Sequence, residues 1–105
     1  MKNSEFTGHL HTYIKLALRG NPCDIDAIIC ELNQKSSLAT TRFVDYALSL
    51  TQNQGGIDRI EHYLFNGSLI QRNYCCLFFN RRGDWDIVKP AYEQGLIDEI
   101  QAYSR

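Results

Sequence analysis

The sequence lacks any apolar run near the ~20 residues that a helix needs to cross a bilayer, and it has little excess of either charge. Its 11 Lys and Arg and 12 Asp and Glu give a formal net charge of −1. Proteins dedicated to nucleic acids or anionic membranes are normally basic, so we expect neither partner. Residues 1–20 contain no apolar signal-peptide core and no small-residue cleavage site, which favours a cytoplasmic protein.

Sequence motifs that carry catalysis or hold metals are also missing. There is no P-loop, dinucleotide glycine motif, nucleophile elbow or His-Glu-x-x-His. His9 and His11 are two positions apart and would point to different sides of a helix, so they cannot share a metal there. None of the four cysteines has Cys-x-x-Cys spacing, and three fall in apolar helical stretches: Cys30, Cys75 and Cys76. We expect no catalytic residue, no metal site and no cofactor, and a small enzyme is the less favoured alternative.

Apolar residues recur at helical spacing along the chain, and no alternating strand pattern is present. The positions expected to face a core are Leu10, Ile14, Ala17 and Leu18; Ile25, Ile28, Ile29 and Leu32; Val44, Ala47, Leu48 and Thr51; Ile57, Ile60 and Leu64; and Tyr74, Leu77 and Phe78. The chain is therefore predicted to be all-α.

Capping residues, prolines and glycines predict where these helices begin and end. Gly20 ends the first helix, and Asn21 followed by Pro22 starts the second. The other predicted starts are Ser4, Ser36 or Ser37, Ser68 and Asp84. We expect a break over 52–56, a helix end at Asn66–Gly67, a turn at Gly83, a kink or break at Pro90, and a last helix over Ile97–Tyr103.

Internal similarity indicates a helical repeat. The pattern Ile-Asp-x-Ile occurs at 25–28, 57–60 and 97–100, and GGIDRIEHY at 55–63 resembles GLIDEIQAY at 95–103. A shift of 30 residues also aligns the helices that follow the first two segments, placing Arg42 on Arg72, Val44 on Tyr74, Ala47 on Leu77 and Leu48 on Phe78.

The stretch from Gly56 to Ile100 resembles one armadillo repeat followed by the opening of the next, and the resemblance covers about residues 22–105. The tryptophan often found four residues before the family's asparagine is Cys76 here and Tyr46 in the earlier copy. That asparagine is present as Asn80 but is Leu50 in the earlier copy, for which HEAT-like packing of two helices is equally tenable.

The resemblance implies a short right-handed α-α superhelix, an armadillo/HEAT-like solenoid of about seven helices. It would form one helical-repeat domain over 1–105. Its parts would be a capping helix over 1–20, a first repeat over 22–54, a second repeat over 56–94 and a terminal half-repeat over 95–105.

In armadillo arrays the long helices line an inner groove that grips an extended peptide. The resemblance therefore implies two exposed rows of partner-binding residues: Arg42, Tyr46 and Leu50 in one repeat, and Arg72, Cys76 and Asn80 in the next. We expect a protein- or peptide-binding scaffold without catalytic activity, whose arginines bind carboxylates and contribute little to stability. The alternatives are self-assembly into a homo-oligomer through the C-terminal end, a purely solvated face, or a nucleic-acid-binding helical domain.

Overall fold

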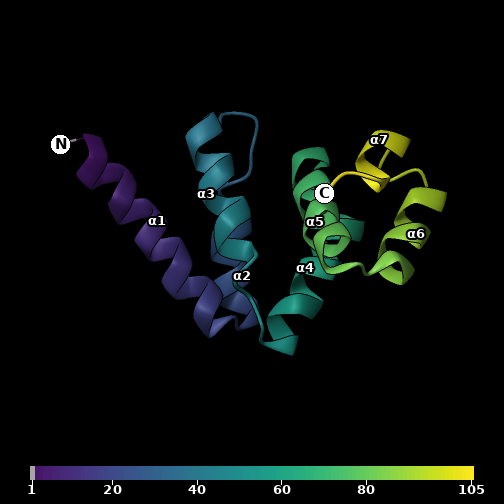
Figure 1. Cartoon of the computed structure of the whole chain (residues 1–105), viewed down its shortest axis with the longest axis horizontal. Coiled ribbons are helices and arrows are strands. Elements are labelled where there is room, and N and C mark those ends of the chain that lie inside the picture. The colour runs from purple at the N-terminus through teal and green to yellow at the C-terminus, as the bar shows by residue number, and fades with distance from the viewer. Residues whose placement is uncertain (1) are drawn as a thin grey trace. The chain divides into compact units, whose positions relative to one another are not determined.

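The computed structural model describes the backbone of residues 2–105 and the side chains of residues 9–105. Within that part of the chain it contains seven helices and no strand, which confirms the all-α prediction. The helices are α1 (Lys2–Arg19), α2 (Pro22–Ile29), α3 (Leu38–Leu48), α4 (Gln54–Asn66), α5 (Leu69–Arg82), α6 (Trp85–Glu93) and α7 (Glu99–Ala102) (Figure 1). Over residues 2–105 none of them combines the length and the apolar character required to cross a membrane.

Contacts divide the chain into two units, residues 1–59 and 60–105, and the division falls inside α4. In the first unit α1 packs against α2 and α3, and α2 also contacts α3. In the second unit α5 packs against α6 and α7, which also contact each other.

Local signals in the sequence begin the helices as predicted at three places. Pro22 opens α2, and the backbone N–H of Asn21 donates to Oδ2 of Asp24 at 3.2 Å. Ser37 caps α3 by accepting the N–H of Thr40. Ser68 caps α5 as part of a capping box with Gln71. Each cap satisfies N–H groups that have no partner inside the helix, which explains why the sequence marks these positions.

The predicted helix ends at Gly20, Asn66–Gly67 and Gly83 are confirmed, and α6 begins after Asp84 as predicted. Other details need correction. Gly55 and Gly56 lie inside α4 instead of forming a break, and Ser4 lies inside α1 instead of capping it. At the start of α6 the carboxylate of Asp84 accepts from Arg82, so it caps no backbone N–H. The helix does not break at Pro90, since α6 runs from Trp85 to Glu93. The last helix is only Glu99–Ala102.

The core of the first unit follows the predicted apolar pattern except on α1. The four predicted residues of the second helix are all buried, as are the four of the third. On α1, however, Leu18 is 65% exposed, and the buried residues are Ala17 and Tyr13. Leu18 follows Ala17 by one position, which rotates it about 100° from the buried side. The Tyr13 hydroxyl donates to Glu31 at 2.9 Å, and burial followed by this carboxylate raises the pKa of Tyr13 to about 12.

The second unit buries a different side of α5 than the sequence predicted. Phe78 is buried as expected, but Tyr74 and Leu77 are only half-buried. The other buried apolar residues of α5 are Cys75, Cys76 and Phe79. Because polar and apolar residues of this helix are not segregated onto two clear sides, its periodicity does not determine which side faces the core.

The third segment of the predicted repeat has a different local structure from the first two. Residues 25–28 and 57–60 are helical throughout, whereas Ile97 and Asp98 precede α7. Ile100 is 77% exposed, although its counterparts Ile28 and Ile60 are fully buried. Asp98 acts as a helix cap, accepting the N–H of Gln101 at 2.8 Å, which explains why the same residue pattern starts a helix here instead of continuing one.

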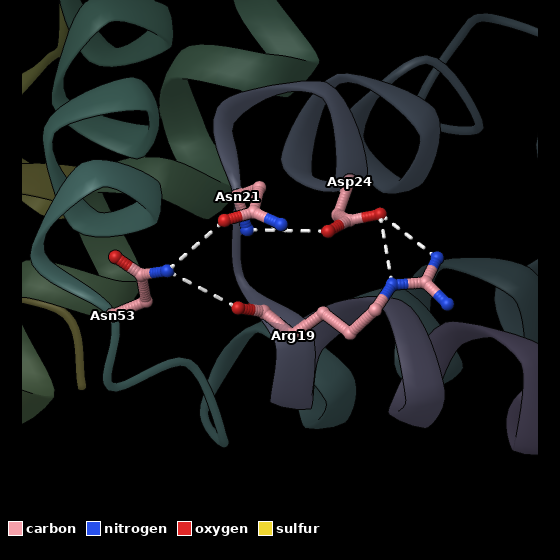
Figure 2. Close-up of polar contacts among 4 residues, drawn as sticks. All are labelled: Arg19, Asn21, Asp24 and Asn53. Carbon is pink, nitrogen blue, oxygen red and sulfur yellow. Dashed lines mark hydrogen bonds and ion pairs between the residues drawn. The ribbon is translucent and has the colours of Figure 1, made fainter.

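A close backbone approach joins the α1–α2 turn to the start of α4 within the first unit. Gly20 has a positive φ of 63°, and a Cβ atom on Gly56 would lie 2.2 Å from the carbonyl oxygen of Gly20. Around this contact the Asn53 amide donates to the Arg19 carbonyl and to Oδ1 of Asn21 at 3.2 and 3.3 Å (Figure 2). The turn and the start of α4 are thus held together where neither glycine leaves room for a side chain.

Replacing Gly56 by alanine should lower the free energy of unfolding by about 1–3 kcal/mol or more, because the new methyl group meets backbone atoms that cannot rotate away. Gly55→Ala is the matched control, since its Cβ would meet nothing closer than 3.4 Å. Urea unfolding of both variants tests this. Equal effects of the two substitutions would show that the Gly20–Gly56 contact adapts without cost.

Asp24 should give the first unit a stability that disappears in acid. Its carboxylate accepts from the Arg19 guanidinium at 2.9 Å, and this hydrogen bond is the main cause of its lowered pKa (Figure 2). Because the pKa of Asp24 is lower in the folded than in the unfolded chain, its carboxylate stabilises the fold at pH values above the unfolded pKa of about 3.9. This stabilisation is lost as the pH falls through the folded pKa. Asp24→Asn should therefore unfold at lower urea concentration at pH 7, with the difference from wild type shrinking below about pH 4. A difference independent of pH would contradict this, and exposed Asp86→Asn serves as control.

Candidate functional site

The first predicted row is partly available at the surface. Arg42 is exposed and makes no hydrogen bond or ion pair with any residue that the structure describes. Tyr46, one turn further along α3, is 54% exposed. Leu50 lies beyond the end of α3 and is half-buried.

The second predicted row is not exposed, which corrects the sequence prediction. Cys76 is fully buried and Asn80 is 8% exposed. Both donate to the main-chain carbonyl of Gln101, at 3.2 and 3.0 Å. The reason is that α7 covers this side of α5. Burial also raises the pKa of the Cys76 thiol to about 11, so it stays protonated at neutral pH.

Arg72 has a structural position within the second unit. Its Nε donates to the Leu96 carbonyl at 2.8 Å, and its Nη1 donates to the Gly67 carbonyl at 2.9 Å. The guanidinium thereby joins the turn before α5 to the turn after α6. The 30-residue shift equates this arginine with Arg42, but the two side chains have different surroundings.

A pocket of about 370 Å³ lies where α7 meets the end of α5 and the start of α6. Its lining residues are Asn80, Gly83, Trp85, Ala102, Tyr103 and Arg105. The rings of Trp85 and Tyr103 stack with centroids 5.3 Å apart and planes 23° apart, and Tyr92 meets Tyr103 edge-on. Trp85 is 36% exposed and Tyr103 is 64% exposed, so the stacked pair presents an aromatic surface to solvent.

A second pocket, of about 410 Å³, lies between α5 and α7, nearer the start of α5. Its lining residues are Asn73, Tyr74, Leu77, Gln101, Ser104 and Arg105. The amide oxygen of Asn73 is buried and accepts no hydrogen bond from the residues that the structure describes. A buried acceptor without a donor is costly and uncommon in native proteins, and this one is enclosed by the protein and not open to the pocket.

The two pockets share Arg105 and lie in succession along one side of α5. Asn73, Leu77 and Asn80 follow the i, i+4, i+7 spacing of that side. Asn73 and Leu77 each lie one position after the predicted Arg72 and Cys76, whereas Asn80 belongs to both rows. Among the residues that the structure describes, Arg105 is the one charged residue lining either pocket.

The side chains of this surface offer stacking rings, hydrogen-bonding groups and one positive charge. Within the described residues, no three His, Cys, Asp or Glu side chains gather as metal ligands would. All four cysteines are free thiols, and Cys30 is exposed instead of belonging to an apolar face. The sequence analysis did not single out Trp85, although it is the single tryptophan of the chain.

Comparison of the chain with protein-family models, with curated proteins and with solved structures gives no match.

The two arginines of the predicted rows should differ in their effect on stability. Arg72→Ala leaves the Leu96 and Gly67 carbonyls without their donors, and we expect a loss of about 1.5–3 kcal/mol, typical of hydrogen bonds to a charged group. Arg42→Ala at an exposed position should stay within about 0.5 kcal/mol of wild type. Thermal and urea unfolding measure both. A stable Arg72→Ala protein would show that these hydrogen bonds do not contribute to folding.

Proposed function

We propose that this chain is a protein- or peptide-binding module without catalytic activity, and that it binds its partner through the stacked Trp85–Tyr103 pair and the adjoining pocket. The observation that carries the proposal is this exposed aromatic pair beside a pocket of about 370 Å³. Tryptophan and tyrosine bury large areas at low entropic cost, and they are enriched among residues that dominate binding energy.

Stacking prepares the aromatic surface for binding. Each ring restricts the other, so less rotamer freedom is lost when a partner covers them. Stacked aromatics can also bind nucleic-acid bases, but such surfaces combine stacking with several cations along the phosphate backbone. The two pockets offer Arg105 alone, and the net charge of the chain is −1. A polypeptide is therefore the better fit.

The proposal does not depend on the armadillo/HEAT-like superhelix, which stays a prediction. The two implied rows differ in how accessible they are to a partner. Arg42 and Tyr46 are exposed, while Cys76 and Asn80 are enclosed by α7. Self-assembly through the C-terminal end is the alternative that the exposed Ile100 and Tyr103 also suit.

Photo-crosslinking in the native cell tests the proposal. Tyr103 is replaced by p-benzoylphenylalanine, and the same amino acid at exposed Gln94 serves as the control because it follows α6 on the side opposite Trp85. We expect a discrete protein adduct from position 103 that is absent from position 94. Adding Trp85→Ala should reduce its yield roughly tenfold or more, as loss of an aromatic anchor does.

Three results would contradict the proposal. Identical adducts from both positions would indicate non-specific contact, and absence of any adduct at 103 would show that no partner reaches this surface. An adduct of twice the chain's own mass would indicate a second copy, in favour of self-assembly.

A further inference from the structure

We infer that residues 98–105 form a hinged strap that opens while the rest of the second unit stays folded, and that its opening takes the aromatic binding surface apart. In the docked form the strap covers one side of α5 and stacks Tyr103 on Trp85. In the undocked form that stack is lost and the thiol of Cys76 becomes accessible. The opening itself needs no partner, whereas its effect on binding rests on the proposed function.

The strap is held in place by few contacts. Among its side chains only that of Ala102 is buried, and the others are half-buried or exposed. Within the described chain, the hydrogen bonds that join the strap to the rest of the unit run from Cys76 and Asn80 to the Gln101 carbonyl. Its own main-chain hydrogen bonds lie within the strap. A segment that buries so little apolar surface opens at a free energy well below that of global unfolding.

The chain just before the strap is anchored independently of it. Nε of Arg72 donates to the Leu96 carbonyl at 2.8 Å, and its Nη1 donates to the Gly67 carbonyl. Neither hydrogen bond involves the strap, so both persist when the strap opens. We therefore expect the pivot to lie after Leu96 and before Asp98, where α7 is capped.

The side chain of Cys76 lies directly beneath the strap. It is fully buried, and its Sγ donates to the Gln101 carbonyl at 3.2 Å. Opening of the strap removes this partner and exposes the thiol to solvent. Cys75 is also fully buried, but it lies one position earlier on α5 and so about 100° around the helix. We expect Cys75 to stay enclosed when the strap opens, which makes it an internal reference.

Opening of the strap separates the two rings of the binding surface. Trp85 belongs to α6 and stays in place, whereas Tyr103 and Arg105 leave with the strap. The undocked form therefore presents a tryptophan without its stacked partner. When only a fraction of a protein is competent to bind, the apparent dissociation constant rises in inverse proportion to that fraction. The contacts that hold the strap thus control binding without touching the partner.

Thiol labelling with N-ethylmaleimide, in the absence of any partner, measures the opening. Cys23→Ser and Cys30→Ser remove the two exposed thiols, and a further Cys75→Ala or Cys76→Ser leaves one buried thiol in each chain. We expect Cys76 to react on the order of a hundredfold faster than Cys75, because local opening costs less than global unfolding. Below the unfolding midpoint, urea should change the Cys76 rate little and raise the Cys75 rate steeply, since the sensitivity to urea follows the surface exposed.

The cap of α7 offers a matched pair of variants. Asp98 is exposed, and its carboxylate accepts the N–H of Gln101 at 2.8 Å. Asp98→Ala should speed the labelling of Cys76 roughly fivefold, as expected for the loss of a helix cap, while Asp98→Asn keeps a capping oxygen and should stay within about twofold of its parent. Neither variant should change the labelling rate of Cys75.

Alkylation of Cys76 tests the effect on the binding surface. A maleimide group on its Sγ occupies the place of the Gln101 carbonyl, so the strap cannot dock again. Because Trp85 is the single tryptophan, iodide should quench its fluorescence more strongly in the alkylated chain, while circular dichroism retains nearly all of the helical signal. With p-benzoylphenylalanine at position 103, the adduct found in the native cell should form in extract with the unmodified chain and not with the alkylated one.

Four results would overturn the inference. Equal labelling rates and equal urea dependence of Cys76 and Cys75 would show that the strap opens only with the whole unit. Labelling of Cys76 as fast as that of exposed Cys23 would show that α7 does not dock. Equal rates for the two Asp98 variants, or loss of the whole helical signal on alkylation, would also contradict it.

The binding function and the strap can fail separately. If labelling behaves as expected while position 103 gives no adduct in the native cell, the proposed function fails and the strap stands. If the adduct persists on the alkylated chain, a partner binds but the strap does not control its binding, and the inference is wrong.

Discussion

The main-chain carbonyl of Gln101 is the acceptor on which the candidate site depends. It receives hydrogen bonds from the Cys76 thiol and the Asn80 amide, both nearly or fully buried on α5. A helix of four residues has almost no stability by itself, because nucleation costs more than so few hydrogen bonds return. These two donors, with the Asp98 cap, hold α7 in place. Both pockets take part of their lining from α7 and the residues that follow it, so both depend on α7 lying against α5.

Much of the helical framework could be predicted because its signals are local. Asn21 followed by Pro22, Ser37 and Ser68 each satisfy N–H groups at a helix start through chemistry contained within four residues. The apolar stripes of α2 and α3 were also correct, since each has one clearly apolar side. Where local signals conflict with tertiary contacts, prediction failed. Gly55 and Gly56 resemble a break in the sequence, yet both lie in α4. The glycine at position 56 is explained by a tertiary contact, because no side chain would fit there against the Gly20 carbonyl.

The candidate site could be predicted only in part, since its geometry depends on long-range contacts. The armadillo resemblance implied the row Arg72, Cys76 and Asn80, while the pockets are lined by Asn73, Leu77 and Asn80. The weak periodicity of α5 gives no indication of which side α7 covers. Alignment by residue type also equated Arg42 with Arg72. The structure separates them, because Arg72 donates to two main-chain carbonyls and Arg42 is exposed. Residue type alone does not distinguish an arginine that binds a partner from one that fixes a turn.

The position of the site on a short helix links ligand binding to the folding of residues 98–105. Tyr103 stacks on Trp85 only while α7 is held against α5, and Arg105 lines the pockets only in the same arrangement. A ligand that covers the stacked Trp85 and Tyr103 rings would therefore bind the docked form of α7 and not the undocked form. By mass action, the free energy by which such a ligand stabilises the docked form rises with the logarithm of the ratio of ligand concentration to dissociation constant. Asn80 would therefore affect such binding indirectly, because its hydrogen bond to Gln101 helps to hold α7 in the docked form.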